Sequence, residues 1–166
     1  MTEKQNQKKY SNVEATDIIH QVANFYINTK VPHDYGTGET YTSVEVHTLK
    51  HIADNPGITV TELARDYGKT KGAVSQILKK IESKGLIRRE ADPGNDNKCL
   101  LYITEKGEML DGAHRSYDER NSSETMDRVR ENFDEDEFNM AFRVLESWLS
   151  VRREVQQERV ARKKHK

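Results

Sequence analysis

Apolar residues between positions 70 and 85 repeat with the period of an α-helix. One stripe, at i, i+3, i+4 and i+7, consists of Val74, Ile77, Leu78 and Ile81. Such a stripe predicts a helix that packs on a core along that face. A second face of the same helix is small, polar and cationic, and it carries Gly72, Ser75, Gln76 and Lys79. We expect this second face to be exposed.

A shorter helix is predicted immediately before this one. Thr59, followed three residues later by Glu62, has the pattern of a capping box, in which each side chain binds the backbone N–H of the other residue. Gly68 then indicates a turn, and Thr70 is a typical N-cap for the second helix. Two helices joined by a tight turn are typical of a helix-turn-helix, whose second helix lies in the major groove of DNA. We assign residues 59–85 to this motif.

Two further helices are predicted on the N-terminal side. Residues 1–12 lack apolar periodicity, so we expect a mobile polar arm there. The first helix is expected over about 13–31, because Pro32 cannot continue it. A turn-rich connector follows. Thr42 and Glu45 then form a second capping-box pattern and start the next helix.

A β-hairpin is predicted after the helix-turn-helix. Two runs with strand-like composition, 86–92 and 99–104, flank a turn rich in Asp, Pro, Gly and Asn. We assign residues 86–103 to this wing. Helices are expected over about 104–155, and the last of them has a wide apolar stripe that predicts a partner helix. Its apolar residues are Phe138, Ala141, Phe142, Leu145, Trp148, Leu149 and Val155.

The composition favours one domain completed by a second copy of the chain. The 166 residues are 34% hydrophobic and 33% charged, and the mean hydropathy of −0.95 is low for a self-sufficient core. We therefore expect a homodimer. No apolar run resembles a membrane span or a secretory signal, so we expect a cytoplasmic protein without a membrane partner. The single cysteine, Cys99, excludes an intrachain disulfide.

Charge is distributed unevenly along the chain, although the formal net charge is only −1. Between positions 65 and 89 the only acidic residues are Asp66 and Glu82, while the basic ones are Arg65, Lys69, Lys71, Lys79, Lys80, Lys84, Arg88 and Arg89. A surface this basic attracts a phosphate backbone. The run 156–166 is also basic, and both a DNA-flanking tail and an extension of the last helix fit it.

These elements resemble the MarR family of bacterial transcriptional regulators over about 13–155. The resemblance rests on the order of elements and on the segments TELARDYG, KGAVSQILKKIESKGLIRR and LYITEKG. It implies a mainly α fold with a small β-hairpin wing (α+β), that is, a winged helix-turn-helix with flanking dimerisation helices. It also implies a homodimer whose two recognition helices read successive major grooves of a pseudo-palindrome.

The predicted DNA-binding residues follow from the position of each on this motif. The first turns of the recognition helix place Thr70, Lys71, Ser75 and Gln76 near bases and phosphates. Gln76 is the best candidate for reading a base, because an amide pairs bidentately with adenine. Gly72 would allow close approach of the backbone. Phosphate contacts are expected from Lys79, Lys80, Arg88 and Arg89, while Lys84 fits a phosphate contact and an ordinary solvated face equally well.

The wing departs from the usual pattern of the family, which has Asp and Arg near its tip. Here the predicted turn contains Asn95, Asp96, Asn97 and Lys98. Asp96 would repel phosphate, so we expect a weaker or shifted contact made by Lys98. In the alternative, Asp96 only stabilises the turn and the wing barely touches DNA.

An effector is harder to infer, and a small aromatic acid, an oxidant and a metal ion all fit the family. His47 and His51 are four residues apart and are expected on one side of a helix, as are His114 and Asp118. A metal ion at His47, His114 and Asp118 is one of the candidate effectors. The connector residues His33, Asp34 and Glu39 would complete a metal shell. Histidines on helices usually have other partners, so we assign no metal site and no cofactor from the sequence.

We predict a sequence-specific regulator of transcription that binds double-stranded DNA as a homodimer. A repressor responsive to a small-molecule effector is favoured, because blocking a promoter requires only DNA binding. The alternative is a winged-helix protein-interaction module that does not bind DNA. An enzyme is not expected, since the chain lacks a Gly-rich phosphate loop and a nucleophile elbow.

Overall fold

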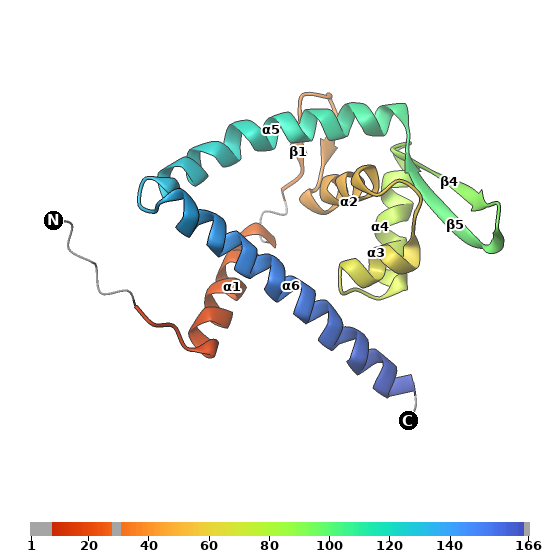
Figure 1. Ribbon diagram of the computed structural model, residues 1–166. Helices are drawn as coiled ribbons and strands as arrows, with labels where there is room; N and C mark the ends of the chain where they lie inside the picture. Colours follow the sequence, from red (N-terminus) through yellow and green to blue (C-terminus); the bar gives the residue numbers. More distant parts are fainter. Residues whose placement is uncertain (1–7, 28–30, 165–166) are drawn as a thin grey trace.

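The computed structural model describes residues 8–27 and 31–164, and this part of the chain is mainly helical (Figure 1). Its helices are α1 (Asn12–Ile27), α2 (Ser43–Asp54), α3 (Val60–Asp66), α4 (Lys71–Ser83), α5 (Glu105–Arg130) and α6 (Glu135–Lys164). Its strands are β1 (His33–Asp34), β2 (Thr40–Tyr41), β3 (Ile58–Thr59), β4 (Ile87–Asp92) and β5 (Asn95–Ile103). This order confirms the predicted mainly α fold with a β-hairpin wing.

The predicted N-caps fix where the central helices begin. At α2, the N–H of Glu45 donates to Thr42 Oγ1 at 3.3 Å, and Glu45 Oε2 accepts the N–H of Thr42 at 2.7 Å. Thr59 and Glu62 form the same capping box at α3. Thr70 caps α4 with its side-chain oxygen. These bonds satisfy N–H groups that have no partner inside the helix, so the start of each helix is defined by its own sequence.

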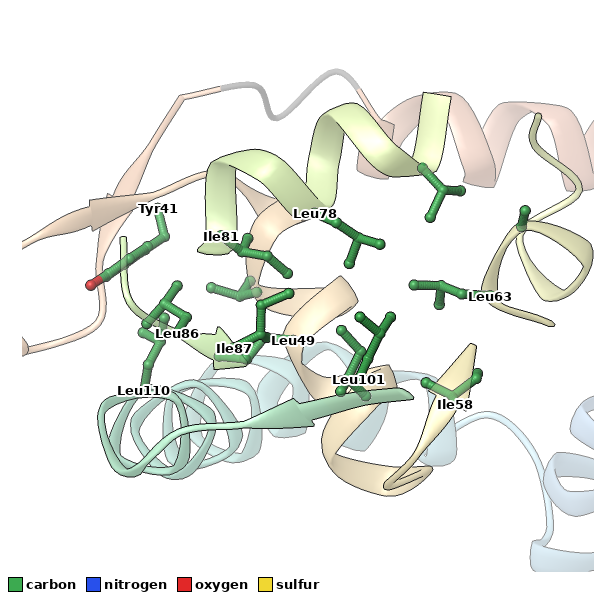
Figure 2. Packing of buried hydrophobic residues seen from close by; sticks show 14 residues of the cluster. Tyr41, Leu49, Ile58, Leu63, Leu78, Ile81, Leu86, Ile87, Leu101 and Leu110 are labelled. Carbon is green, nitrogen blue, oxygen red and sulfur yellow. The ribbon is translucent and has the colours of Figure 1, made fainter. Parts of the chain in front are cut away.

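The core lies between α2, α4, the sheet and the first turns of α5 (Figure 2). The apolar stripe of α4 enters it as predicted, since Val74, Leu78 and Ile81 are fully buried and Ile77 is half-buried. Each such side chain contributes about 1.5–3 kcal/mol when it is removed from water. The opposing residues include Leu49, Ile52, Leu63, Leu86, Leu101 and Leu110. The core therefore fixes which face of α4 remains exposed.

The wing is confirmed, but its turn is tighter than predicted. Residues 95–98, expected in the turn, belong to β5. The reason lies in Asp92 and the two residues after it: Asp92 Oδ1 accepts the N–H of Gly94 at 2.9 Å, and Pro93 fixes the backbone at the second position. Asp, Pro and Gly therefore close the hairpin without the following residues.

The register of the wing contains a bulge next to this turn. Ala91 pairs with Cys99, whereas Asp92 pairs with Asn95, so residues 96–98 have no counterpart on β4. A bulge of this kind bends the strand that contains it. On its other edge β5 pairs with β3, a short strand that the sequence did not predict.

The N-terminal segments differ from prediction in detail. α1 begins at Asn12, one residue before the predicted start, and Ser11 caps it together with Glu14. It is described to Ile27, and the predicted end near residue 31 follows residues 28–30, which lie outside the described residues, as do residues 1–7 of the expected arm. The connector after α1 is ordered as a hairpin, because β1 and β2 pair antiparallel.

The start of α5 is attached to the end of α4. The N–H of Thr104 donates to the carbonyl of Leu86 at 3.0 Å, and its hydroxyl donates to the carbonyl of Gly85 at 2.7 Å. Gly107 lies in the first turn of α5 against the same Leu86 carbonyl. The absence of a side chain at Gly107 is what allows this close approach.

α6 is longer than the predicted dimerisation helix. It begins after Asp134, which caps it together with Glu137, and it continues to Lys164. Residues 156–164, for which a tail and a helical extension were both open, are therefore helical. In Figure 1 α6 crosses α1 and then passes α3. None of the helices in the described ranges is long and apolar enough to cross a membrane.

Candidate nucleic-acid interface

The polar face of α4 is exposed, as the sequence predicted. Gly72, Gln76 and Lys79 lie at the surface, and Ser75 is half-buried. Because Gln76 is exposed, its amide is available to a ligand. A narrow helix with one buried apolar face and one exposed polar face fits into the major groove of B-DNA.

The lysines of α4 are free to meet an anion. Among the described residues, Lys71, Lys79 and Lys80 have no carboxylate oxygen within 4.0 Å, and all three are exposed. An exposed lysine without an ion-pair partner breaks no existing ion pair when it binds phosphate. The side chains of α4 therefore form a basic, polar surface along one helix.

The two arginines of β4 already have partners within the chain. Arg89 Nε donates to both carboxylate oxygens of Glu82 at 3.0 Å. Arg88 donates to Glu90 at 2.8 Å and to the carbonyl of Ile103 at 2.6 Å. A phosphate contact from either arginine would compete with these bonds. Their predicted role is therefore less direct than that of the lysines on α4.

Lys84 forms an ion pair within the chain, which neither the predicted phosphate contact nor the predicted solvated face included. Its Nζ lies 2.9 Å from Glu45 Oε1 and 4.7 Å from the centre of the Tyr41 ring. Burial alone would raise the pKa of Glu45, but the N–H of Thr42 and the Lys84 ammonium outweigh it and hold the pKa below its usual 4.5. Lys84 thus connects the end of α4 to the start of α2.

At the wing, Lys98 lies in the bulge of β5 and is exposed. The side chains of Asp96 and Asn97 lie outside the described part of the chain. A contact between Lys98 and DNA remains a prediction.

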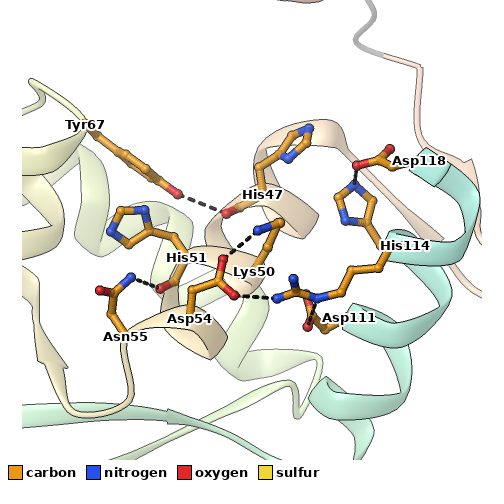
Figure 3. Close-up of polar contacts among 10 residues, drawn as sticks. His47, Lys50, His51, Asp54, Asn55, Tyr67, Asp111, His114 and Asp118 are labelled. Carbon is orange, nitrogen blue, oxygen red and sulfur yellow. Dashed lines mark hydrogen bonds and ion pairs between the residues drawn. The ribbon is translucent and has the colours of Figure 1, made fainter. Parts of the chain in front are cut away.

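A second polar cluster joins α2 to α5, away from α4 (Figure 3). One ligand atom from each of His47, His114 and Asp118 lies within 4.8 Å of the others. His114 is only 2% exposed; its Nε2 is 3.3 Å from Asp118 Oδ2, and its Nδ1 has no hydrogen-bond partner among the described residues. Burial lowers the pKa of His114, while Asp118 acts in the opposite direction. Two imidazoles and one carboxylate are a typical ligand set for a divalent metal ion.

The other candidate ligands are not part of this cluster. His51, four residues after His47 on α2, lies outside it, with its Nε2 3.3 Å from Asp66 Oδ2 on α3. Asp34 accepts backbone N–H groups in its own turn, and Glu39 binds Lys106 at 2.8 Å. Of the candidate ligands considered from the sequence, the structure brings together His47, His114 and Asp118.

α3, α4 and the β4–β5 hairpin, with the polar face of α4 exposed, define a winged helix-turn-helix protein. Residues 40–96, from β2 into the wing, match the model of the MarR family. A crystal structure of MarR superimposes with a TM-score of 0.62 at 26% identity, covering 89% of this chain and 97% of that chain. The chain is thus similar to the MarR family in its winged helix-turn-helix fold and, over residues 40–96, in its sequence.

Other similar proteins cover the chain less completely or at lower identity. The transcriptional regulator HosA of Escherichia coli O111:H- is 32% identical over 69 residues, which are 42% of this chain and 51% of HosA. The chain spans about half the length of the curated relatives it matches. FabT of Streptococcus pneumoniae, solved in complex with DNA, superimposes with a TM-score of 0.59 at 20% identity, over 87% of this chain and 96% of that chain. That likeness shows a shared fold.

Proposed function

We propose that this protein is a sequence-specific transcriptional regulator that binds double-stranded DNA as a homodimer and represses transcription from a pseudo-palindromic operator. The observation that carries the proposal is the exposed polar face of α4, whose lysines have no carboxylate partner among the described residues. The match of residues 40–96 to the MarR family and the DNA complex of FabT, a protein of the same fold, support it.

Dimerisation is supported by apolar surface that a single chain leaves uncovered. On α1, Val13 is 70% exposed and Phe25 is 75% exposed. On α6, large apolar side chains that are at least 40% exposed include Met140, Phe142, Val144, Leu145 and Leu149. Surface of this extent usually marks an interface, and a two-fold interface presents the same patch from both copies. Two copies of α4 would then face two half-sites of one duplex.

Two substitutions on α4 test the DNA interface. Gln76→Ala is expected to relax base preference, because a bidentate base contact is worth about 1–3 kcal/mol of discrimination. Lys79→Ala is expected to weaken binding to all sequences about equally and to reduce the slope of log K against log salt by about one. Fluorescence anisotropy titrations of the duplex upstream of the protein's own gene, and of a scrambled duplex, measure both effects.

The same titrations separate the proposal from its alternative. A regulator shows steep salt dependence and saturates with two protomers per duplex. A protein-interaction module would show weak binding that does not depend on salt. If both substitutions left duplex affinity unchanged, α4 would not be the recognition helix.

We propose further that a divalent metal ion is the effector, because of the cluster of His47, His114 and Asp118. The ligand set of two imidazoles and one carboxylate suits zinc, and His114 is buried with its Nε2 beside Asp118 Oδ2. The three residues would hold the ion between α2 and α5, and a bound ion would act as a fixed positive charge there. It would alter DNA affinity only as far as it favours one arrangement of these helices over another.

Replacing one ligand tests this metal site directly. His114→Gln is expected to weaken binding of Zn²⁺ by about tenfold or more, measured by competition with a chromogenic chelator. His51→Gln is the matched control, since His51 also lies on α2 but binds Asp66. The expected result is one tight Zn²⁺ site per protomer in the wild type and in the control. Equal affinities in all three proteins would contradict the site.

A further inference from the structure

A groove separates the C-terminal part of α6 from α3 and the turn that precedes α4. Its volume is about 490 Å³. From the helix-turn-helix it is lined by Thr61, Ala64, Arg65, Gly68, Lys69 and Lys71. α6 contributes Arg153, Gln156, Gln157, Val160 and Ala161, at the spacing i, i+3, i+4, i+7 and i+8. One face of α6 therefore forms one wall of the groove.

A direct hydrogen bond holds α6 in this position. Gln156 Nε2 donates to the carbonyl of Gly68 at 2.9 Å. A Cβ atom on Gly68 would lie only 2.8 Å from Gln156 Oε1, so the two segments are in close contact. The C-terminal part of α6 thus lies beside the turn before α4 and lines the groove together with Lys71.

The groove is strongly cationic. Its lining includes Arg65, Lys69, Lys71 and Arg153 and contains no carboxylate. Only Arg65 has an ion-pair partner among the described residues, Asp66 at 3.0 Å. Lys69, Lys71 and Arg153 have no carboxylate within 4.0 Å in the part of the chain that the structure describes, although they come from segments more than 80 residues apart. An arrangement of this kind favours an anion.

We infer that this groove binds phosphates of the DNA backbone, so that α6 extends the DNA-binding surface beyond α4. The inference rests on the proposed function and adds a contact to it. Lys71 belongs both to the first turn of α4 and to the groove, which makes the two surfaces continuous. In Figure 1 the wing lies on the other side of α3 and α4 from the end of α6. Contacts from α6 would therefore position the duplex on the side opposite the wing.

The test compares the salt dependence of DNA binding among variants of the whole chain, on the duplex used for Gln76→Ala and Lys79→Ala. Arg153→Gln is expected to reduce the salt slope by about 0.9 for each phosphate contact that is lost. Arg153→Lys, which keeps the charge, is expected to restore most of the slope. Arg128→Gln is the control, because it removes the same charge from an α5 side chain that is 74% exposed and lies outside the groove. Thermal melting checks that all the variants fold alike.

The outcomes distinguish failure of the α6 contact from failure of the proposed DNA-binding function. A reduced slope for Arg153→Gln alone supports the α6 contact. Equal slopes for Arg153→Gln and wild type, with Lys79→Ala still reduced, would overturn the α6 contact and leave the proposed function standing. An equal reduction with Arg128→Gln would also overturn it, because net charge would then explain the loss. Salt-insensitive binding by the wild type would contradict both proposals.

Discussion

Gly107→Ala is expected to destabilise the protein by about 3 kcal/mol, the scale of an overpacked site with little room to relax. A Cβ atom at this position would lie 2.2 Å from the carbonyl oxygen of Leu86 and 3.2 Å from Ile103 Cβ. The obstacle is backbone, so it cannot rotate away. The Leu86 carbonyl also accepts the N–H of Thr104, and moving α5 outward would weaken the bond that attaches it to α4.

Gly112 provides a matched control on the same helix. It is exposed, and a Cβ atom there would meet nothing within 4 Å. Gly112→Ala is therefore expected to stabilise the protein by up to about 1 kcal/mol, since alanine is the better helix former. Urea denaturation at one fixed protomer concentration measures both variants. Equal stabilities of the two variants would show that α5 does not approach Leu86 as closely as described.

Glu45→Ala is expected to lower the free energy of unfolding by about 2–3 kcal/mol, because one carboxylate makes two stabilising interactions. It completes the capping box of α2, whose loss costs about 1 kcal/mol, and it is the buried partner of Lys84. Glu62→Ala removes the equivalent capping carboxylate from α3, where the side chain is exposed. This substitution is expected to lower the free energy of unfolding by less than about 1 kcal/mol. A similar loss for both variants would mean that the Lys84 ion pair contributes nothing.

The same carboxylate predicts how stability depends on pH. Because folding lowers the pKa of Glu45, the unfolded chain binds a proton more readily, and the stabilisation is present above the usual value of 4.5. It is lost progressively as the pH falls below 4.5, towards the lowered pKa. Glu45→Gln keeps an oxygen that can accept the N–H of Thr42 but has no charge to lose. Its stability should therefore fall less steeply than that of the wild type between pH 5 and about pH 3; parallel curves would contradict this assignment.

The parts of the fold that sequence predicted correctly are local. Thr59 and Glu62 are three residues apart, and Val74 and Leu78 are four apart, so backbone geometry alone brings each pair together. The wing turn was predicted too long because Asn and Asp at 95–97 are common in turns too, and the sequence alone did not show that Pro93 and Gly94 would close the hairpin first.

The interactions that sequence did not predict connect distant segments. His47, His114 and Asp118 were candidates, but the contact of His51 with Asp66 depends on how α3 packs on α2 and could not be predicted from spacing. Arg89 was expected at phosphate, but the antiparallel return of the chain after α4 places it against Glu82. The density of basic residues could be predicted from the sequence. The sequence could not show which of these residues lack an ion-pair partner, because folding brings acidic residues near some of them.

The position of α6 also has a practical consequence for handling the protein. Because α6 is described to Lys164 and lies beside α3, an affinity tag fused behind it would begin close to the cationic groove. A polyhistidine tag there would add metal-binding and cationic side chains next to α4, and it would distort both the zinc and the salt titrations. A tag ahead of α1, removed by a protease before measurement, leaves that end of the molecule unaltered.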